Sequence, residues 1–181
     1  MDLIWNMEDG SANSNEKIRS IDSTEKSFLM FVNGTSRNIT IYWLDYNGTP
    51  KVFQRLRPRG AVEVNTFRSH AWTFRDAYNG ERMKVLNQSV YVAEPYFMRH
   101  PRDPGVLVSA RKVLTVHFPL RTLRENMLWH IVREMNCRSE ETIEQYDLPR
   151  VLKDDLISIF KQVLAFRRST GNLEFLMFYN N

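Results

Sequence analysis

The sequence is poor in the residues that build disulfide frameworks and metal sites. It contains a single cysteine, Cys137, which excludes an intrachain disulfide framework and suits a reducing compartment. Its four histidines, His70, His100, His117 and His130, show no spacing typical of metal ligands. One cysteine cannot complete a cysteine-rich zinc site. We therefore expect no bound metal.

Long apolar runs and known catalytic motifs are also missing. No stretch approaches the length of a membrane-spanning helix, and the N-terminus lacks the basic and apolar segments of a secretory signal. The sequence has no glycine-rich phosphate loop, no G-x-S-x-G elbow and no H-E-x-x-H motif. These absences predict a soluble protein of the cell interior that binds no cofactor.

The charge balance is mild. The chain carries 25 basic and 21 acidic residues, a net charge of +4, and the basic residues are scattered along it, which argues against nucleic-acid binding. Its 181 residues, of which 43% are hydrophobic and 12% aromatic, are enough to bury a core as one domain or two small ones.

The first two thirds of the chain consists of short strand-like segments separated by turns. Several of them alternate apolar and polar residues, which is the pattern of a strand with one buried face. Such segments at a spacing of roughly ten residues are typical of an antiparallel sandwich, and we expect about seven strands. The predicted strands are 27–32, 38–45, 51–56, 61–67, 71–76, 82–86, 89–93 and 112–118, with a loop that holds Pro95, Pro101, Pro104 and Gly105.

The hydrophobic period changes at Pro119. Apolar residues then recur at steps of three and four, which predicts an amphipathic helix over 120–135. Thr122 and Glu125 have the spacing of a capping box at its start. Its apolar residues cover more than one narrow stripe, which indicates either a second surface to cover or a single small core that takes both stripes.

Two further helices are predicted. One begins at Ser139, a residue suited to capping, and the other begins at Pro149 and runs to about Arg167, since proline is favoured at the first helical position. A domain with so few helical residues buries little surface by itself. We therefore expect the helical part of the chain to pack on its neighbour or on a partner. We expect a flexible tail (1–17), a β-sandwich (18–118), a helical domain (119–160) and a C-terminal segment (161–181) that packs on the sandwich, with a strand at Leu173–Tyr179.

The segment Asn65–Asp76 holds the candidate binding residues. A turn at Arg68–Ser69 would let Thr66 and His70 converge beside aromatic side chains, which is the composition of a small binding pocket. The alternative is that the aromatic residues belong to the core and that His70 is a polar neighbour whose hydrogen bonds are satisfied.

Several motifs together resemble the von Hippel-Lindau tumour suppressor family over residues 18–160. They are Ile18-Arg-Ser-Ile-Asp-Ser23, Phe31-x-Asn33, Trp43-Leu44 with Gly48-x-Pro50, Phe67-Arg-x-His70-x-Trp72-x-Phe74-Arg75-Asp76, and Pro119-x-x-Thr122-Leu123-x-Glu125. The resemblance implies a non-catalytic substrate receptor of a cullin-RING ubiquitin ligase, located in the cytoplasm and nucleus.

The resemblance also implies the partner of the β-domain. This partner is the prolyl-hydroxylated α subunit of hypoxia-inducible factor, which the ligase marks for degradation by the proteasome. Thr66 and His70 would bond the added hydroxyl, and Asn65 would lie on the strand that pairs with the peptide backbone. The implied peptide-binding residues are Trp43, Phe53, Asn65, Thr66, Phe67, His70 and Trp72. The family has tyrosine at the positions of Phe53 and Phe67, and serine at that of Thr66.

The helical domain resembles the part of the family that binds elongin C, which itself carries elongin B, and a cullin. The implied elongin C contacts are Thr122, Leu123, Arg124, Met127, Leu128 and Ile131, with Met127 where the family has cysteine. The implied cullin contacts are Leu148, Pro149, Leu152 and Leu156.

Two other functions stay open from the sequence. One is a structural adaptor whose β-domain binds an unmodified partner, such as a matrix or cytoskeletal protein. The other is a small hydrolase that uses His70 as general base.

Overall fold

The computed structural model describes residues 18–134 and 139–171. These residues divide into two compact units, a β-domain of residues 18–77 and 82–119 and a helical domain of residues 78–81 and 120–171. The predicted strand at Leu173–Tyr179 and the predicted tail at 1–17 lie outside the described residues.

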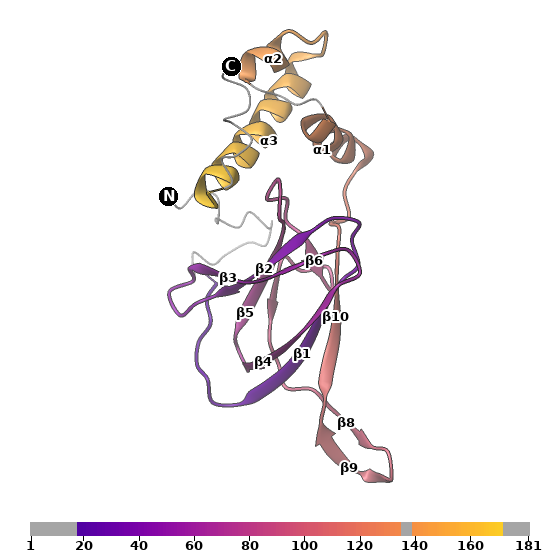
Figure 1. The fold of residues 1–181 in the computed structure, drawn as a ribbon. Coiled ribbons are helices and arrows are strands. Elements are labelled where there is room, and N and C mark those ends of the chain that lie inside the picture. The colour runs from indigo at the N-terminus through magenta and orange to yellow at the C-terminus, as the bar shows by residue number, and fades with distance from the viewer. Residues whose placement is uncertain (1–17, 135–138, 172–181) are drawn as a thin grey trace. The chain divides into compact units, whose positions relative to one another are not determined.

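The β-domain is a sandwich of two four-stranded sheets with an additional hairpin (Figure 1). The sheet orders are β4-β1-β10-β6 and β3-β2-β5-β7, and β8 pairs with β9. The strands of the described β-domain are β1 (Lys26–Asn33), β2 (Ile39–Leu44), β3 (Pro50–Leu56), β4 (Ala61–Phe67), β5 (Ala71–Asp76), β6 (Lys84–Val85), β7 (Val90–Val92), β8 (Phe97–His100), β9 (Asp103–Ser109) and β10 (Arg111–His117). The predicted fold class, mainly β with a smaller α domain, is confirmed. One pair, β1 with β10, is parallel.

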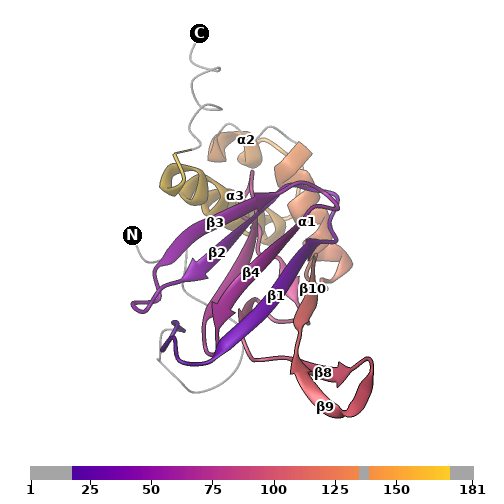
Figure 2. The ribbon, with the colours of Figure 1, turned by 60° about the horizontal axis from the view of Figure 1, so that its bottom comes forward.

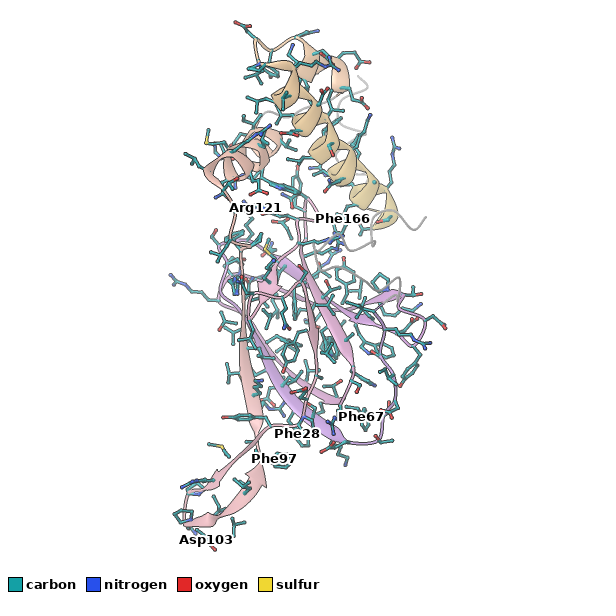
Figure 3. The ribbon with its side chains drawn as sticks, turned by 180° about the vertical axis from the view of Figure 1, so that it is seen from behind. Phe28, Phe67, Phe97, Asp103, Arg121 and Phe166 are labelled. Atoms are coloured by element: carbon teal, nitrogen blue, oxygen red, sulfur yellow. The ribbon has the colours of Figure 1, made fainter. Side chains whose placement is uncertain are left out.

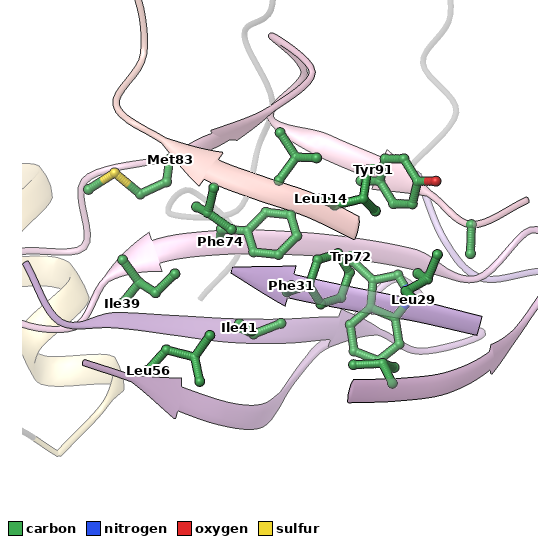
Figure 4. Close-up of a cluster of buried hydrophobic side chains, with 14 residues drawn as sticks. Leu29, Phe31, Ile39, Ile41, Leu56, Trp72, Phe74, Met83, Tyr91 and Leu114 are labelled. Atoms are coloured by element: carbon green, nitrogen blue, oxygen red, sulfur yellow. The ribbon is translucent and has the colours of Figure 1, made fainter. Parts of the chain in front are cut away.

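Buried aliphatic and aromatic side chains together fill the space between the two sheets (Figure 4). Phe31 of β1 lies 4.9 Å from Phe74 and 5.7 Å from Trp72, between ring centroids, so one strand of the first sheet contacts two residues of β5. All six residues of β5 are buried. Strand β5 is therefore fixed from both faces, which gives its first residues a rigid position.

The loop predicted around the prolines is wrong, because β8 and β9 form a hairpin there. The hairpin extends away from the two larger sheets (Figures 1 and 2), and Asp103 lies near its tip (Figure 3). Its register passes directly from Arg99–Leu107 to His100–Asp103, which places Pro104 in a bulge. A proline in a bulge costs no ladder hydrogen bond, so the prolines do not prevent strand formation.

The helical domain contains the three helices that the sequence predicts. They are α1 (Leu123–Glu134), α2 (Glu140–Glu144) and α3 (Arg150–Ser169). The capping box is present, since the Glu125 N–H donates to Thr122 Oγ1 at 3.2 Å and the Thr122 N–H donates to the Glu125 carboxylate at 2.8 Å. Helix α3 continues past the domain boundary expected at residue 160, because Val163 and Phe166 extend its buried stripe.

The turn Tyr78–Glu81 groups with the helices, although it follows β5 in the chain. Glu81 forms an ion pair with Arg121, and the guanidinium of Arg167 lies 4.4 Å from the centroid of the Tyr78 ring. Phe166, labelled in Figure 3, lies against Gly80. The sequence shows this turn only as the end of a strand, because its partners are far away along the chain.

Gly80 offers a test of this packing. It has a φ of +74°, and a Cβ at this position would lie 2.2 Å from Cγ of Phe166. We expect Gly80→Ala to lower the free energy of unfolding of the helical domain by about 2–4 kcal/mol, through backbone strain and overpacking together. The measurement is urea denaturation of the full chain followed by far-ultraviolet circular dichroism.

Gly171 is the matched control, with a φ of +68° and no atom within 4 Å of an added Cβ. Gly171→Ala should cost only the backbone term of about 1 kcal/mol. Equal losses in the two variants would contradict the contact between Gly80 and Phe166.

Candidate functional site

The candidate site is built on the turn between β4 and β5. Ser69 has a φ of +66°, and the His70 N–H donates to the Phe67 carbonyl at 3.2 Å, so the chain reverses within a few residues. This reversal places Thr66 Oγ1 at 3.0 Å from His70 Nδ1. The convergence that the sequence predicts is therefore present, and we call these two residues the Thr66–His70 pair.

The second ring nitrogen of His70 also has a hydroxyl partner. Ser23 Oγ lies 3.1 Å from His70 Nε2 and 2.7 Å from the phenolic oxygen of Tyr46. Ser23 and Tyr46 were not predicted as site residues. Ser23 could have been found from the sequence, because it ends the first motif quoted above. Tyr46 carries no such signal, because its segment has the composition of a simple turn.

Ser20 ties the chain before β1 to this turn. Its hydroxyl donates to the Leu44 carbonyl of β2 and accepts a hydrogen bond of 3.0 Å from the Ala71 N–H of β5. Ser20 is buried, so these bonds are shielded from water. The segment that carries Ser23 is thereby held against both strands.

Aromatic rings surround the imidazole of His70. The ring centroids of Trp43 and Phe67 lie 5.5 Å from that of His70, and the Tyr46 centroid lies 5.9 Å from it. Phe67 is labelled in Figure 3, at the end of β4. The result is a polar pair set among apolar faces, which is the composition of a small-ligand site.

Trp72 and Phe53, the remaining predicted aromatics, extend these rings into a continuous aromatic wall. Trp72 lies directly across the strand pair from Trp43, so their side chains share a face of the sheet. The Phe53 ring packs edge-on against Trp72 with centroids 5.2 Å apart. Trp72 is buried, as the core alternative proposes, whereas Phe53 is 44% exposed. The wall therefore runs from the core to the surface.

Two buried donors in this wall have no acceptor within the described part of the chain. They are the indole N–H groups of Trp43 and Trp72. Most buried polar groups in proteins are hydrogen-bonded, and an unpaired one costs about 1–3 kcal/mol. A ligand or water oxygen beside the wall would satisfy them.

Strand β4 borders the site and lies at the edge of its sheet. Asn65 is exposed on this strand, and its Oδ1 accepts a hydrogen bond of 2.9 Å from Arg111. An edge strand presents unpaired backbone groups, which an extended peptide can use to add a strand. The predicted position of Asn65 beside a bound peptide suits this geometry.

Burial lowers the pKa of His70 below its usual value, and the backbone carbonyl and charge of Asp22 oppose this shift. His70 is 7% exposed, so protonation would place a charge in an apolar setting. The imidazole is therefore neutral at physiological pH, with one ring nitrogen as donor and the other as acceptor.

The predicted elongin C contacts divide between the surface and the core of the helical domain. Leu123 and Met127, one helical turn apart on α1, are 78% and 50% exposed. Leu128 is buried and Ile131 packs beside it. Arg124 is exposed and pairs with Asp155 at 2.6 Å, and Thr122 caps the helix. Only Leu123 and Met127 present apolar surface outward.

The predicted cullin contacts lie at the start of α3. Leu156 is buried, and Leu148 and Leu152 pack against the same helical core. Pro149 is exposed and occupies the N-cap position. The apolar spacing that suggested a cullin site is thus largely explained by packing among the three helices.

Metal and membrane features are not found in residues 18–134 and 139–171. No group of three or more histidine, cysteine or acidic residues there could hold a metal ion. None of the helices in this part of the chain is long and apolar enough to cross a membrane.

Comparison with known proteins identifies the family. A family model described as the VHL beta domain matches residues 18–98. Protein Vhl of Drosophila melanogaster is 35% identical over 150 residues, which cover 80% of this chain and 83% of that protein. The chain belongs to the VHL family. Proteins of the VHL family are non-catalytic adaptors of ubiquitin ligase complexes, and membership supports a role in substrate recognition. The residues matched by the family model include Ser23, Tyr46 and the Thr66–His70 pair.

The buried imidazole makes stability depend on pH. Because the pKa of His70 is lower in the folded than in the unfolded protein, the unfolded state binds more protons. The free energy of unfolding should therefore fall as the pH drops through the unfolded value of about 6.5. We expect the wild type to lose more stability between about pH 7.5 and pH 5.5 than His70→Asn, measured by urea denaturation.

The control for this experiment is His100→Asn, on the hairpin. This variant should keep the pH dependence of the wild type. If His70→Asn kept it as well, His70 would not be the group that resists protonation.

Proposed function

We propose that the Thr66–His70 pair binds the hydroxyl of a hydroxylated proline in the α subunit of hypoxia-inducible factor. The chain would then act as the substrate receptor of a cullin-RING ubiquitin ligase. One observation carries this proposal: a buried hydroxyl and a neutral imidazole lie 3.0 Å apart among aromatic rings.

A hydroxyl group both donates and accepts, as this pair requires. In the free protein, Thr66 and His70 bond each other. A hydroxyproline would separate them and replace the lost bond, with its hydroxyl accepting from one residue and donating to the other. An unmodified proline that separated the pair in the same way would offer no hydroxyl, and it would leave two buried polar groups unpaired at about 1–3 kcal/mol for each. Sites of this kind reject ligands that lack the hydroxyl by large factors.

The surroundings of the pair suit an extended peptide. The rings of Trp43 and Phe67 offer apolar faces to a pyrrolidine ring, and β4 offers a free backbone edge. Carbonyl groups of the peptide could accept from the indole N–H groups of Trp43 and Trp72. Phe53 and Phe67 keep the aromatic surface of the family but lack its phenolic hydroxyls, so this chain depends more on the Thr66–His70 pair.

Two versions of one peptide test the proposal, one with proline and one with hydroxyproline. We expect the hydroxylated peptide to bind about a hundredfold more tightly, because two polar groups stay paired. Thr66→Val and His70→Ala should each reduce that ratio about tenfold, measured by isothermal titration calorimetry. Thr115→Val, at an exposed position on β10, is the matched control and should leave the ratio unchanged. Equal binding of both peptides would favour an adaptor for an unmodified partner.

The helical domain would connect the receptor to the ligase. We propose that elongin C, with elongin B, docks on the exposed face of α1 that presents Leu123 and Met127. Apolar side chains that are half or more exposed on one helical face indicate a binding surface. The cullin would contact the start of α3 near Pro149. Such a receptor contributes proximity between substrate and conjugating enzyme rather than chemistry.

Charged substitutions on α1 test the elongin surface. We expect Leu123→Asp and Met127→Asp each to weaken binding of the elongin B–C complex by at least about a hundredfold, since a carboxylate would be buried without a partner. Both variants should still bind the hydroxylated peptide. The measurement is co-purification and calorimetry with the full chain.

Val151→Asp is the control, because Val151 is 63% exposed on α3. It should keep elongin binding. If all three variants bound elongin like the wild type, the exposed face of α1 would not be the docking surface.

A further inference from the structure

Hydroxyl groups flank both ring nitrogens of His70. Thr66 Oγ1 lies 3.0 Å from Nδ1, and Ser23 Oγ lies 3.1 Å from Nε2. A hydroxyl can donate or accept, so these two contacts alone allow either neutral tautomer of the imidazole. The tautomer decides whether Nδ1 presents a lone pair or a proton to a ligand.

The Thr66 hydroxyl discriminates between the tautomers and favours the one protonated on Nε2. Its hydrogen bond to His70 Nδ1 is the only one that its side chain makes among the described residues. If Nδ1 carried the proton, Thr66 Oγ1 would accept and its own proton would have no acceptor in a buried setting. If Nδ1 carries a lone pair, the Thr66 hydroxyl donates to it and the bond is satisfied.

Ser23 and Tyr46 complete a directional chain. With the proton on Nε2, Ser23 Oγ accepts from His70 and its own proton goes to the phenolic oxygen of Tyr46, 2.7 Å away. Tyr46 is held edge-on against Trp43, with ring centroids 5.6 Å apart. Ser20 fixes the backbone of the segment to β2 and β5. In this arrangement His70 donates to Ser23, and Ser23 donates to Tyr46.

We propose that Ser23 and Tyr46 are positioning residues that hold His70 in the tautomer protonated on Nε2. Nδ1 then presents a lone pair to the ligand, beside the donor hydroxyl of Thr66. A ligand oxygen must accept from Thr66 and donate to His70, so the site selects a hydroxyl over a ketone or ether oxygen. The inference rests on the proposed function for the identity of the ligand, but the state of His70 is a property of the free protein.

The first test measures the tautomer directly. Long-range nitrogen–proton NMR correlations of the full chain should show His70 protonated on Nε2. In Tyr46→Phe, Ser23 loses its acceptor and can turn to donate to Nε2, so the form protonated on Nδ1 should appear. Tyr96→Phe, which removes a phenol that is 40% exposed on the surface, is the matched control and should leave the His70 signals unchanged.

The second test uses two peptides, one with hydroxyproline and one with a proline that carries a ketone at the same carbon. The ketone only accepts, so it should bind poorly when Nδ1 holds a lone pair. We expect Tyr46→Phe to reduce the preference for the hydroxyl about tenfold. Any difference in ring shape between the peptides is the same for both proteins. Ser23→Ala should weaken hydroxyproline binding, and Ser23→Thr, which keeps the hydroxyl, should restore it.

The outcomes distinguish the control of the His70 tautomer by Ser23 and Tyr46, which we call the relay, from the proposed function. Protonation of Nδ1 in the wild type, or unchanged NMR signals and peptide preference in Tyr46→Phe, would overturn the relay. In another outcome, the wild type shows the Nε2 tautomer and Tyr46→Phe shows the form protonated on Nδ1, but the wild type binds neither peptide. That result would reject hydroxyproline as the ligand and leave the relay standing.

Discussion

The crossing of the chain from one sheet to the other at Arg68–Ser69 is the constraint on which the site depends. Strand β4 is at the edge of one sheet, and β5 is inside the other. A residue with positive φ must join them within a few positions, and Ser69 adopts that conformation at some cost. The same crossing brings a threonine from an edge strand beside a histidine anchored by a buried strand. The site is therefore held rigidly by β5 and is accessible to a peptide along β4.

The helical domain uses its few apolar residues for two purposes. Leu128, Leu156 and Phe160 pack among the helices, whereas Leu123 and Met127 face outward. The internal core does not take both apolar stripes of α1, because Leu123 and Met127 are exposed. The three leucines of the predicted cullin pattern pack in the internal core, whereas Pro149 is exposed. A leucine spacing of four is also what any packed helix requires.

Local sequence patterns predicted most of the strands and helices. Most of the features that they missed depend on contacts between residues far apart in the sequence. Alternation placed most strands, and the capping box and Pro149 placed two helix starts, because these signals lie within a few residues. The hairpin was missed because prolines normally interrupt strands and a bulge was not foreseen. Ser23 reaches His70 over 47 positions, and Arg167 reaches Tyr78 over 89. The periodic pattern of apolar residues contains no information about such distant pairs. The Thr66–His70 pair was predictable because only a short turn separates its members.

The parallel pairing of β1 with β10 has a consequence for how the protein is made. These strands are the first and the last of the β-domain, and β1 lies between β10 and β4 in its sheet. During synthesis the sandwich cannot close until β10 has left the ribosome, and β1 has one exposed edge until then. Pairing between such distant segments slows folding and prolongs exposure of apolar surface. The β-domain therefore completes its core only after its last strand, β10, has emerged.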